Sequence, residues 1–471
     1  MDIRERKSRN SFQLQDETSS VSTDQTSEKA EALYVNDIGN GRSLPAKSGT
    51  LTIFKTFNIR LFLIFAAYWL ILVHTIERWR VKSAMEKCQW KNWENWDGDR
   101  AMVTPHRVAF IADPQLVDDH TYPKLPRVLN YLIRRMSDNY HYINYKYLQS
   151  LLDPDTTIFI GDLFDGGRDW DYAPWLEEYH RFCRIFPENE KRQSIRGLPG
   201  NHDIGFQTVS PERCERFASH FGEPNAVYTL GNHTFVQLDT ISLSHEDPEV
   251  HSAARAFLES CKKLLDPNLP RIVLTHVPLY RDPQVEKCGP GRESKKPFPL
   301  MRGVEYQTVI DYPISEDILK NLGPSLVFSG DDHDYCDMTH VDYADNTKFL
   351  AREISCKTNS MTNGIKSPAV QLLSLNNPQD TEHTFSETYK TTMCYLPSPY
   401  FGVKVYAASL VANFAILYAW TKFPENFDLF ARGSVVFVLN LSPLERRKTL
   451  FIHFGAIFSF FVVLISLYNK M

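Results

Sequence analysis

Short apolar runs alternate with amphipathic segments through the middle of this 471-residue chain. Runs of β-branched and aromatic residues predict buried strands at residues 107–111, 156–160, 194–198, 271–274 and 325–328. Residues 227–230 and 234–238 predict a hairpin, and residues 347–354 and 369–375 predict strands that complete a second sheet. A helical period between the strands predicts helices at 126–137, 139–152, 172–186, 211–221 and 249–265. We therefore expect an α/β fold with a two-sheet β-sandwich core flanked by helices.

Three longer apolar segments lie outside this core, at residues 59–76, 400–420 and 450–468. Each is long enough to cross a bilayer at about 1.5 Å of rise per residue. The first segment begins far from Met1 and lacks a small-residue cleavage site, which predicts a signal anchor instead of a cleaved signal peptide. Residues 433–441 are apolar but too short to span a bilayer, so we expect an interfacial or re-entrant piece there.

These segments predict that the chain has four parts. They are a disordered cytosolic tail (1–50), a transmembrane anchor (59–77), a lumenal domain (100–398) and a C-terminal membrane region with about two helices (400–471). The orientation follows from positive charge, because the N-terminal tail and Arg446-Arg447-Lys448 both lie in the cytosol if the domain is lumenal. The glycosylation sequon Asn232-His233-Thr234 agrees with this orientation. Eight cysteines allow disulfides without fixing their pairing, and a net charge of −5 gives no indication of nucleic-acid binding.

Polar motifs follow directly after five of the predicted strands. They are Ala112-Asp113-Pro114-Gln115, Gly161-Asp162-Leu163-Phe164-Asp165, Gly200-Asn201-His202-Asp203, Thr275-His276-Val277 and Gly330-Asp331-Asp332-His333-Asp334. A single Asp or His in such a place is more often a cap, a turn or a core residue. Because strand ends of an α/β fold meet at one edge of the sheet, the five motifs together predict a site for two metal ions, built from oxygen and imidazole ligands.

In order and residue type these motifs resemble the calcineurin-like metallophosphoesterases, whose pattern is D-x-H, GD-x-x-D, GNH-D/E, a lone His and G-H-x-H. The resemblance covers residues 108–340 and implies the metallophosphoesterase fold. It implies that Asp113, Gln115 and His333 hold one metal ion, that Asn201, His276 and Asp331 hold the other, and that Asp162 bridges the two. It also implies that His202, oriented by Asp165, protonates the leaving group or stabilises the transition state.

Two residues depart from the family pattern. Gln115 and Asp331 stand where the family has histidines, and both keep an oxygen that can bind a metal. Exchanging imidazoles for oxygens favours manganese or magnesium over zinc, so we expect two divalent ions with Mn²⁺ as the preferred metal. Gly166-Gly167 follow Asp165 where phosphomonoesterases of the family often have Arg, which favours a diester substrate.

The N-terminal anchor, the stretch Pro278-Leu279-Tyr280-Arg281 and the apolar C-terminus are similar to the fungal GPI-anchor remodelling phosphodiesterases. This resemblance implies a multi-pass enzyme of the endoplasmic reticulum or Golgi membrane. It would remove side-chain ethanolamine phosphate from a mannose of GPI anchors, with GPI lipid or GPI-anchored proteins as its substrate. Two alternatives stay open: a lumenal phosphomonoesterase acting on protein or lipid, and a membrane scaffold with a decayed metal site. The basic insertion (residues 278–313) is either a substrate-contacting segment above the metals or a solvated loop.

Overall fold

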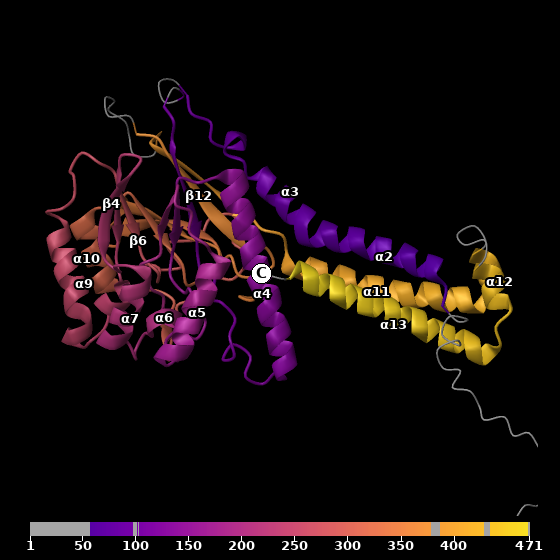
Figure 1. The fold of residues 1–471 in the computed structure, drawn as a ribbon. Coiled ribbons are helices and arrows are strands. Elements are labelled where there is room, and N and C mark those ends of the chain that lie inside the picture. Colours follow the sequence, from indigo (N-terminus) through magenta and orange to yellow (C-terminus); the bar gives the residue numbers. More distant parts are fainter. Residues whose placement is uncertain (1–56, 98–100, 102, 378–386, 428–433, 470–471) are drawn as a thin grey trace, which may run out of the picture. The chain divides into compact units, whose positions relative to one another are not determined.

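The computed structural model describes residues 57–97, 101, 103–377, 387–427 and 434–469 (Figure 1). The predicted disordered tail, residues 1–50, lies outside the described residues. Contacts between Cα atoms divide the chain into Met1–Phe54 and Lys55–Met471, and everything described below belongs to the second unit.

Two mixed sheets form the core, which confirms the predicted α/β fold. The first has the order β13-β12-β1-β2-β3, with β1 (His106–Ile111), β2 (Thr156–Phe159), β3 (Gln193–Ile195), β12 (Ala369–Leu375) and β13 (Tyr389–Tyr395). The second has the order β10-β11-β9-β6-β5-β4, with β4 (Ala226–Leu230), β5 (His233–Gln237), β6 (Arg271–Leu274), β9 (Leu326–Ser329), β10 (Cys336–Asp342) and β11 (Asp345–Ser355). A two-stranded ribbon of β7 (Arg302–Gly303) and β8 (Tyr306–Gln307) lies in the insertion.

The central strands are apolar throughout because both of their faces are buried. Val108 and Phe110 of β1 belong to the cluster between the sheets, where the Phe110 and Phe328 rings are 4.2 Å apart. Ala109 and Ile111 belong to a second cluster, which includes side chains of the helices. These helices are α5 (Tyr172–Ile185), α6 (Asn201–Ile204), α7 (Pro211–Phe221), α8 (Thr240–Leu243), α9 (Pro248–Cys261) and α10 (Tyr312–Leu322). The predicted cap of α7 is confirmed, since the Ser210 side chain accepts from the Arg213 N–H.

Two sequence predictions about the core are wrong in detail, and two strands were not predicted. The segments predicted at 347–354 and 369–375 do not share a sheet, because β11 pairs with β9 whereas β12 pairs antiparallel with β1. The helices predicted at 126–137 and 139–152 form one continuous helix, α4 (Arg127–Tyr147), which continues as the π-helix η4 (Leu148–Leu152). Asp138, the residue between the two predicted helices, lies within α4, and its carboxylate is paired with Arg181 at 2.7 Å. Strands β10 and β13 have no counterpart among the predictions.

In the part of the chain that the structure describes, three helices are long and apolar enough to cross a membrane, and their spans are Ile59–Lys87, Pro399–Lys422 and Pro443–Tyr468. The first comprises α2 (Ile59–His74), the π-helix η1 (Thr75–Trp79) and α3 (Arg80–Lys87), and the others are α11 (Pro399–Lys422) and α13 (Pro443–Tyr468). They contact one another through side chains: the Trp69 and Phe461 rings are 4.3 Å apart, and the Tyr68 hydroxyl bonds Ser409 Oγ at 2.7 Å. The shorter elements are η2 (Trp90–Asn92), η6 (Pro424–Phe427) and α12 (Ser434–Leu439), the last within the apolar stretch predicted to be too short to span.

Two disulfides join distant parts of the chain. Cys88, at the C-terminus of α3, is bonded to Cys394 of β13, and this links the first apolar helix to the first sheet. Cys288 of the insertion is bonded to Cys336, at the start of β10. Cys183, Cys214, Cys261 and Cys356 are free thiols.

Candidate metal centre

The structure brings all seven predicted ligands to one place, because the strands that precede them end at the same edge of the core. Asp113 follows β1, Asp162 follows β2 and His276 follows β6. Asp331 and His333 follow β9, and Asn201 begins α6. Positive φ angles occur at five of the seven residues: Asp113 (48°), Gln115 (37°), Asp162 (51°), Asp331 (64°) and His333 (61°). Left-handed backbone at non-glycine residues costs free energy and is concentrated at functional sites, where it aims side chains that a regular strand would point elsewhere.

Two groups of ligand atoms share the Asp162 carboxylate. Asp113, Asp162 and His333 offer ligand atoms that all lie within 4.8 Å of one another, and so do Asp162, His276 and Asp331. The shared carboxylate is the arrangement that a bridge between two cations requires. The two groups match the ligand sets predicted from the sequence, apart from the amide ligands Gln115 and Asn201.

Buried atoms without partners mark where cations fit in this site. Asp113 Oδ2 and Asn201 Oδ1 are buried and lack a hydrogen-bond partner, and the buried His276 Nε2 lies 3.3 Å from Asp162 Oδ1 without a well-aligned hydrogen bond. The second polar atom of each of these side chains is hydrogen-bonded to the backbone. Asp113 Oδ1 accepts from the Asp331 N–H at 2.9 Å, Asn201 Nδ2 donates to the Glu305 carbonyl at 2.9 Å, and His276 Nδ1 contacts the Ile160 carbonyl at 2.8 Å. Leaving a buried polar group unsatisfied is unfavourable unless a ligand completes it. Carboxylate, amide oxygen and imidazole nitrogen are all ligands for divalent metals, so the residues present fit two such ions.

Gln115 is oriented differently from the sequence prediction. Its amide Nε2 donates to Asp162 Oδ2 at 2.7 Å, so the nitrogen, not the oxygen, faces the shared carboxylate. A half-turn of the amide about its last side-chain bond would present the oxygen to a cation. Ligation by Gln115 therefore stays a prediction.

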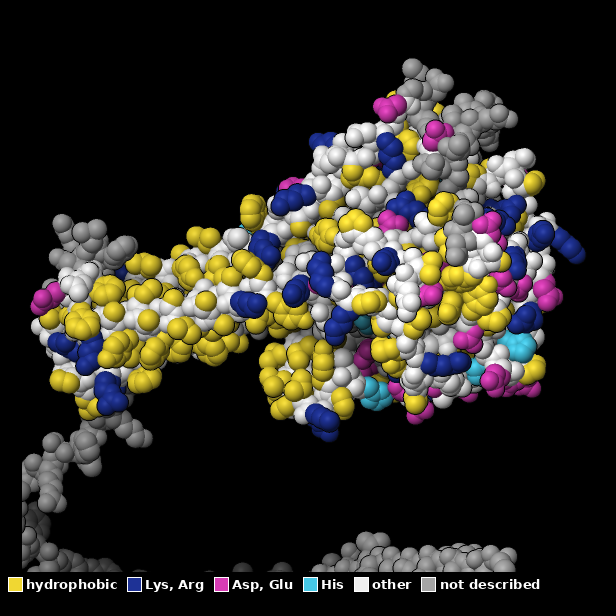
Figure 2. Space-filling view, turned by 180° about the vertical axis from the view of Figure 1, so that it is seen from behind, with side chains coloured by type: hydrophobic (Ala, Val, Ile, Leu, Met, Phe, Trp, Pro, Cys, Tyr) yellow, Lys and Arg dark blue, Asp and Glu magenta, His cyan; other side chains and the backbone are white. Residues whose placement is uncertain are grey.

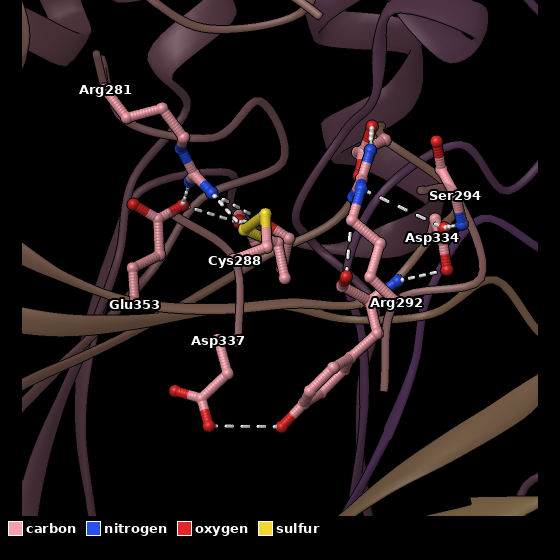
Figure 3. Close-up of a disulfide and its surroundings, with 12 residues drawn as sticks. Arg281, Cys288, Arg292, Ser294, Asp334, Asp337 and Glu353 are labelled. Atoms are coloured by element: carbon pink, nitrogen blue, oxygen red, sulfur yellow. Dashed lines mark hydrogen bonds and ion pairs between the residues drawn. A yellow bond between two sulfur atoms is a disulfide. The ribbon is translucent and has the colours of Figure 1, made fainter. Parts of the chain in front are cut away.

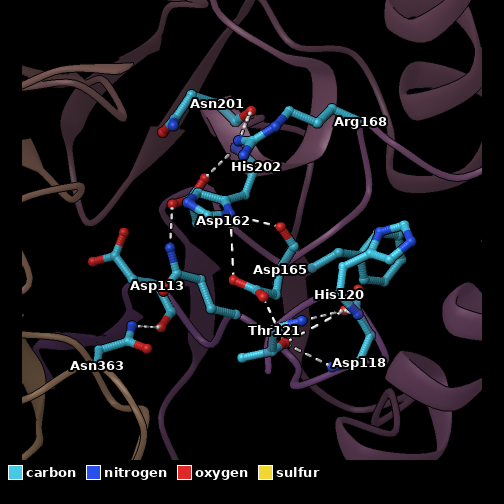
Figure 4. A network of polar contacts seen from close by, with 12 residues as sticks. Asp113, Asp118, His120, Thr121, Asp162, Asp165, Arg168, Asn201, His202 and Asn363 are labelled. Atoms are coloured by element: carbon cyan, nitrogen blue, oxygen red, sulfur yellow. Dashed lines mark hydrogen bonds and ion pairs between the residues drawn. The ribbon is translucent and has the colours of Figure 1, made fainter. Parts of the chain in front are cut away.

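His202 and Asp165 lie together beside this cluster (Figure 4). The His202 Nδ1 atom is 2.6 Å from the backbone carbonyl oxygen of Asp165 and 3.3 Å from its carboxylate Oδ1. The carboxylate is held in turn by Thr121, whose hydroxyl donates to Asp165 Oδ2 at 2.5 Å. These contacts fix the imidazole so that Nε2 is the nitrogen left for a substrate.

The electrostatics of the site are dominated by buried carboxylates. Burial raises the pKa of Asp113 well above its usual range, and it raises the pKa of Asp331 to about 7 against the opposing charge of His276. Burial lowers the pKa of His202, but the carboxylates of Asp162 and Asp165 outweigh this effect and raise it to about 9. Carboxylates gathered at close range repel one another, and bound cations relieve that repulsion.

Comparison with known proteins identifies the family. Residues 106–335 match the family model described as calcineurin-like phosphoesterase. The chain is 47% identical over 369 residues to Cell division control protein 1 of Saccharomyces cerevisiae, an alignment that covers 76% of this chain and 74% of that one. This chain belongs to the calcineurin-like phosphoesterase family. Metallophosphoesterase 1 of Rattus norvegicus is 27% identical over 301 residues, covering 59% of this chain and 70% of its own.

Solved structures give a weaker likeness to this calcineurin-like phosphoesterase. A purple acid phosphatase from yellow lupin seeds aligns over 61% of this chain and 53% of its own, with 13% identity and a TM-score of 0.35. That score is too low to support an argument about the site. The family assignment and the cluster of possible metal ligands together make the protein a metal-dependent phosphoesterase.

Sequence reasoning missed the residues that brace the phosphoesterase site. The Asp203 carboxylate accepts from the Gly200, Leu163 and Phe164 backbone N–H groups at 2.8–3.1 Å, and so ties the second motif to the third. Thr358 and Asn363 both donate to the Asp113 carbonyl, at 2.8 and 3.2 Å. The position of Asp203 at the end of its motif is a signal in the sequence that could have indicated its role. Thr358 and Asn363 lie between β11 and β12, in a segment whose sequence shows no motif.

Two arginines of the insertion, Arg281 and Arg292, form ion pairs within the fold (Figure 3). Arg281 is fully buried and pairs with Glu353 at 2.5 Å, and its guanidinium also lies 3.2 Å from the sulfur of Cys336. Arg292 is paired with Asp332. Both guanidinium groups are therefore paired with carboxylates of the protein, and contact between residues 278–313 and a substrate stays a prediction. The insertion does reach the site, but through the backbone of Glu305.

Proposed function

We propose that this phosphoesterase is a membrane-anchored phosphodiesterase of the secretory pathway that removes side-chain ethanolamine phosphate from a mannose of GPI anchors. The observation that carries the proposal is the physical link between the site and the apolar helices. The Cys88–Cys394 disulfide joins α3 to β13, two strands from β1, whose end bears Asp113. A site held at a membrane meets a lipid-anchored substrate at high effective concentration.

A diester substrate agrees with the positive charges around the site. Arg168 is the guanidinium next to the third motif, and its Nη1 donates to the Asn201 carbonyl at 3.0 Å. Arg281 and Arg292 are paired with carboxylates. A phosphomonoester carries one more negative charge than a diester and would have to be matched by more positive charge from the protein. The three arginines named above already make hydrogen bonds or ion pairs within the described part of the protein. This favours the diester over the alternative of a phosphomonoesterase.

The roles of the residues follow from their contacts. Asp113, Gln115, His333, Asn201, His276 and Asp331 would hold two divalent ions, with Asp162 between them. Two such ions, for which the oxygen-rich ligands favour Mn²⁺, would supply a hydroxide nucleophile at neutral pH and would neutralise charge on the phosphoryl oxygens. His202 donates a proton to the departing mannose hydroxyl, and Asp165 holds the imidazole in place through its carbonyl and carboxylate.

A lumenal location is part of the proposal. Both disulfides require an oxidising compartment such as the lumen of the endoplasmic reticulum. The sequon residue Asn232 is half-buried at the tight turn between β4 and β5, and its amide donates to the Asn377 carbonyl at 2.8 Å.

The test uses the full chain in lipid nanodiscs with Mn²⁺ and a GPI glycolipid that bears ethanolamine phosphate. The expected product is phosphoethanolamine, released by the native protein and not by Asp162→Asn. Hydrolysis of a soluble diester without attack on the glycolipid would refute the GPI substrate and keep the metal chemistry. Faster hydrolysis of a monoester than of its matched diester would favour the phosphatase alternative. A metal content well below two per chain with no hydrolysis would favour the scaffold.

A further inference from the structure

The N-terminal half of α4 carries an apolar surface that is exposed among the described residues. The α4 patch consists of Leu125, just before the helix, and Val128, Leu129, Tyr131 and Leu132 on it. Their exposed fractions are 37%, 70%, 47%, 62% and 48%, respectively. Contiguous exposed apolar side chains usually mark a surface that meets a partner or a membrane.

From its middle to its C-terminal end, α4 lies beside the C-terminal end of α13, the segment before α11 and the C-terminal end of α2. Arg135 Nη2 donates to the carbonyl of Asn469, the residue that ends α13, at 2.9 Å. The Tyr140 hydroxyl donates to the carbonyl of Pro397, two residues before α11, at 2.9 Å. Tyr147 lines a groove together with His74, the last residue of α2. Helix α4 therefore lies at the level where the apolar helices end, and Figure 1 shows it running across their direction.

The patch continues the face of α4 that meets these helix ends. Leu129, Tyr140 and Tyr147 are separated by eleven and seven residues, which correspond to three and two helical turns. Val128, Leu132 and Arg135 are separated by four and three residues and form the adjoining row. Because the face is continuous, the patch points toward the same side of the protein as the contacts with α11 and α13.

The groove beside Tyr147 has the chemistry of a membrane–water boundary. Its volume is about 560 Å³, and its lining is His74, Arg78, Trp79, Lys82, Tyr147, Leu467 and Tyr468. Aromatic rings and long cationic side chains are typical of the headgroup level of a bilayer. Figure 2 shows Lys and Arg side chains gathered where the apolar surface of these helices ends. The groove therefore supports a position of the C-terminal end of α4 near the headgroup level, and this argument does not use the patch.

We propose that the α4 patch inserts into the interfacial region of the phospholipid bilayer that surrounds α2, α11 and α13. The helix would then lie in the plane of the interface, with Lys124 and Arg127 near lipid phosphates at its exposed end. The bilayer is the occupant that the contacts favour, because the patch is continuous with the ends of the apolar helices.

This insertion would hold one edge of the metal centre against the membrane. Only nine residues separate Gln115 from Leu125, and within them Thr121 donates to the Asp165 carboxylate. Asn130 of α4 donates to the Tyr122 carbonyl at 3.1 Å and so ties this short segment to the helix. A patch fixed in the bilayer therefore restrains the position of the residues that orient His202. The proposal does not depend on the identity of the substrate.

The experiment places an environment-sensitive fluorophore on Val128→Cys in the full chain, in nanodiscs of phosphatidylcholine with phosphatidylinositol. The matched control is Leu264→Cys, which is 63% exposed and follows α9. The native chain, which has the free thiols Cys183 and Cys214, measures background labelling. We expect nitroxide-bearing lipids to quench the probe at 128 and not at 264, and aqueous iodide to quench the probe at 264 more strongly.

A second variant separates insertion from general proximity to lipid. Adding Leu132→Glu, at an exposed position that tolerates a charge in the folded protein, should abolish lipid quenching of the probe at 128. Equal iodide quenching at both positions would overturn the proposal. Shielding of position 128 from iodide without lipid quenching, together with a dimer by mass, would overturn it in favour of a second copy of the chain.

Discussion

The side chain of Asn201 is bonded to the backbone carbonyl of Glu305 at 2.9 Å, across 104 residues of sequence. This bond uses the amide nitrogen, and so it leaves the buried oxygen of Asn201 as the atom offered to a metal. The insertion thus contacts the site by supporting the side chain of one proposed ligand. Such outer contacts orient ligands and contribute to metal affinity.

Removing that support should weaken metal binding without removing a ligand. Deleting Val304 and Glu305 from the β7–β8 turn eliminates the carbonyl that Asn201 uses, and we expect metal affinity to fall about 10–100-fold. Chelator competition with Mn²⁺ measures this change. The control is Glu305→Gly, which keeps the carbonyl and suits the φ of 63° at this position. An equal loss in both proteins would mean that the Glu305 carboxylate, not the backbone, is the important group.

His202 and Asp165 should contribute unequally to turnover. We expect His202→Ala to lower kcat by about 10²–10⁴-fold with unchanged metal content, as for the loss of a general acid. Asp165→Asn should cost less, because the closer contact to His202 Nδ1 is the backbone carbonyl at 2.6 Å, which this substitution keeps. Steady-state kinetics with metal analysis of both variants tests the order. A larger effect for Asp165→Asn would show that the carboxylate has the dominant role.

Gly161 should be irreplaceable for a steric reason. Its φ is +72°, and a Cβ atom there would lie 2.3 Å from His276 Nδ1, so Gly161→Ala must displace a proposed ligand. Gly364→Ala is the matched control, since its φ is +75° and no atom lies within 4 Å of an added Cβ. Both variants should lose about 1–2 kcal/mol of stability from the backbone alone. Only Gly161→Ala should lose metal and activity, as measured by metal content and hydrolysis.

The Cys288–Cys336 disulfide should stabilise the insertion and, through it, the site. The cysteines are 48 residues apart, and closing a loop of that size stabilises a fold by up to about 4 kcal/mol. Replacing both by serine should lower the melting temperature, increase proteolysis within residues 278–313 and weaken metal binding. A destabilised protein with native metal affinity would show that the Asn201–Glu305 contact does not need the disulfide.

Stability should depend on pH through His340. Burial lowers the pKa of His340, but hydrogen bonds to Glu286 and Glu353 outweigh it and raise the pKa above 6.5. A raised pKa stabilises the fold fully below about pH 6.5 and ceases to do so as the pH rises through the folded-state value. The loss of melting temperature in His340→Gln should therefore be largest near pH 6 and shrink at alkaline pH. A loss that does not vary with pH would indicate that neutral His340 contributes by packing alone.

The sequence by itself determined the elements whose signal is local. Strands β1, β2, β6 and β9 are buried on both faces, so each is a continuous apolar run, and the polar motif directly after each run predicts site residues by position. The three apolar helices could also be predicted from the sequence, because length and hydrophobicity alone define them. The family pattern then assigned the seven expected ligands before any geometry was known.

Tertiary structure decided whatever depends on partners far away in sequence. Strand β12 lies beside β1 because it pairs there, and no local pattern specifies which sheet a strand joins. The pairing of four cysteines among eight, the brace of Thr358 on Asp113 and the turning of the Gln115 amide toward Asp162 are likewise set by contacts across the fold. Helix α4 shows the same contrast between sequence and structure. Its apolar period is visible in the sequence. Only the tertiary structure shows that one half of its apolar face packs beside the apolar helices and that the other half is exposed.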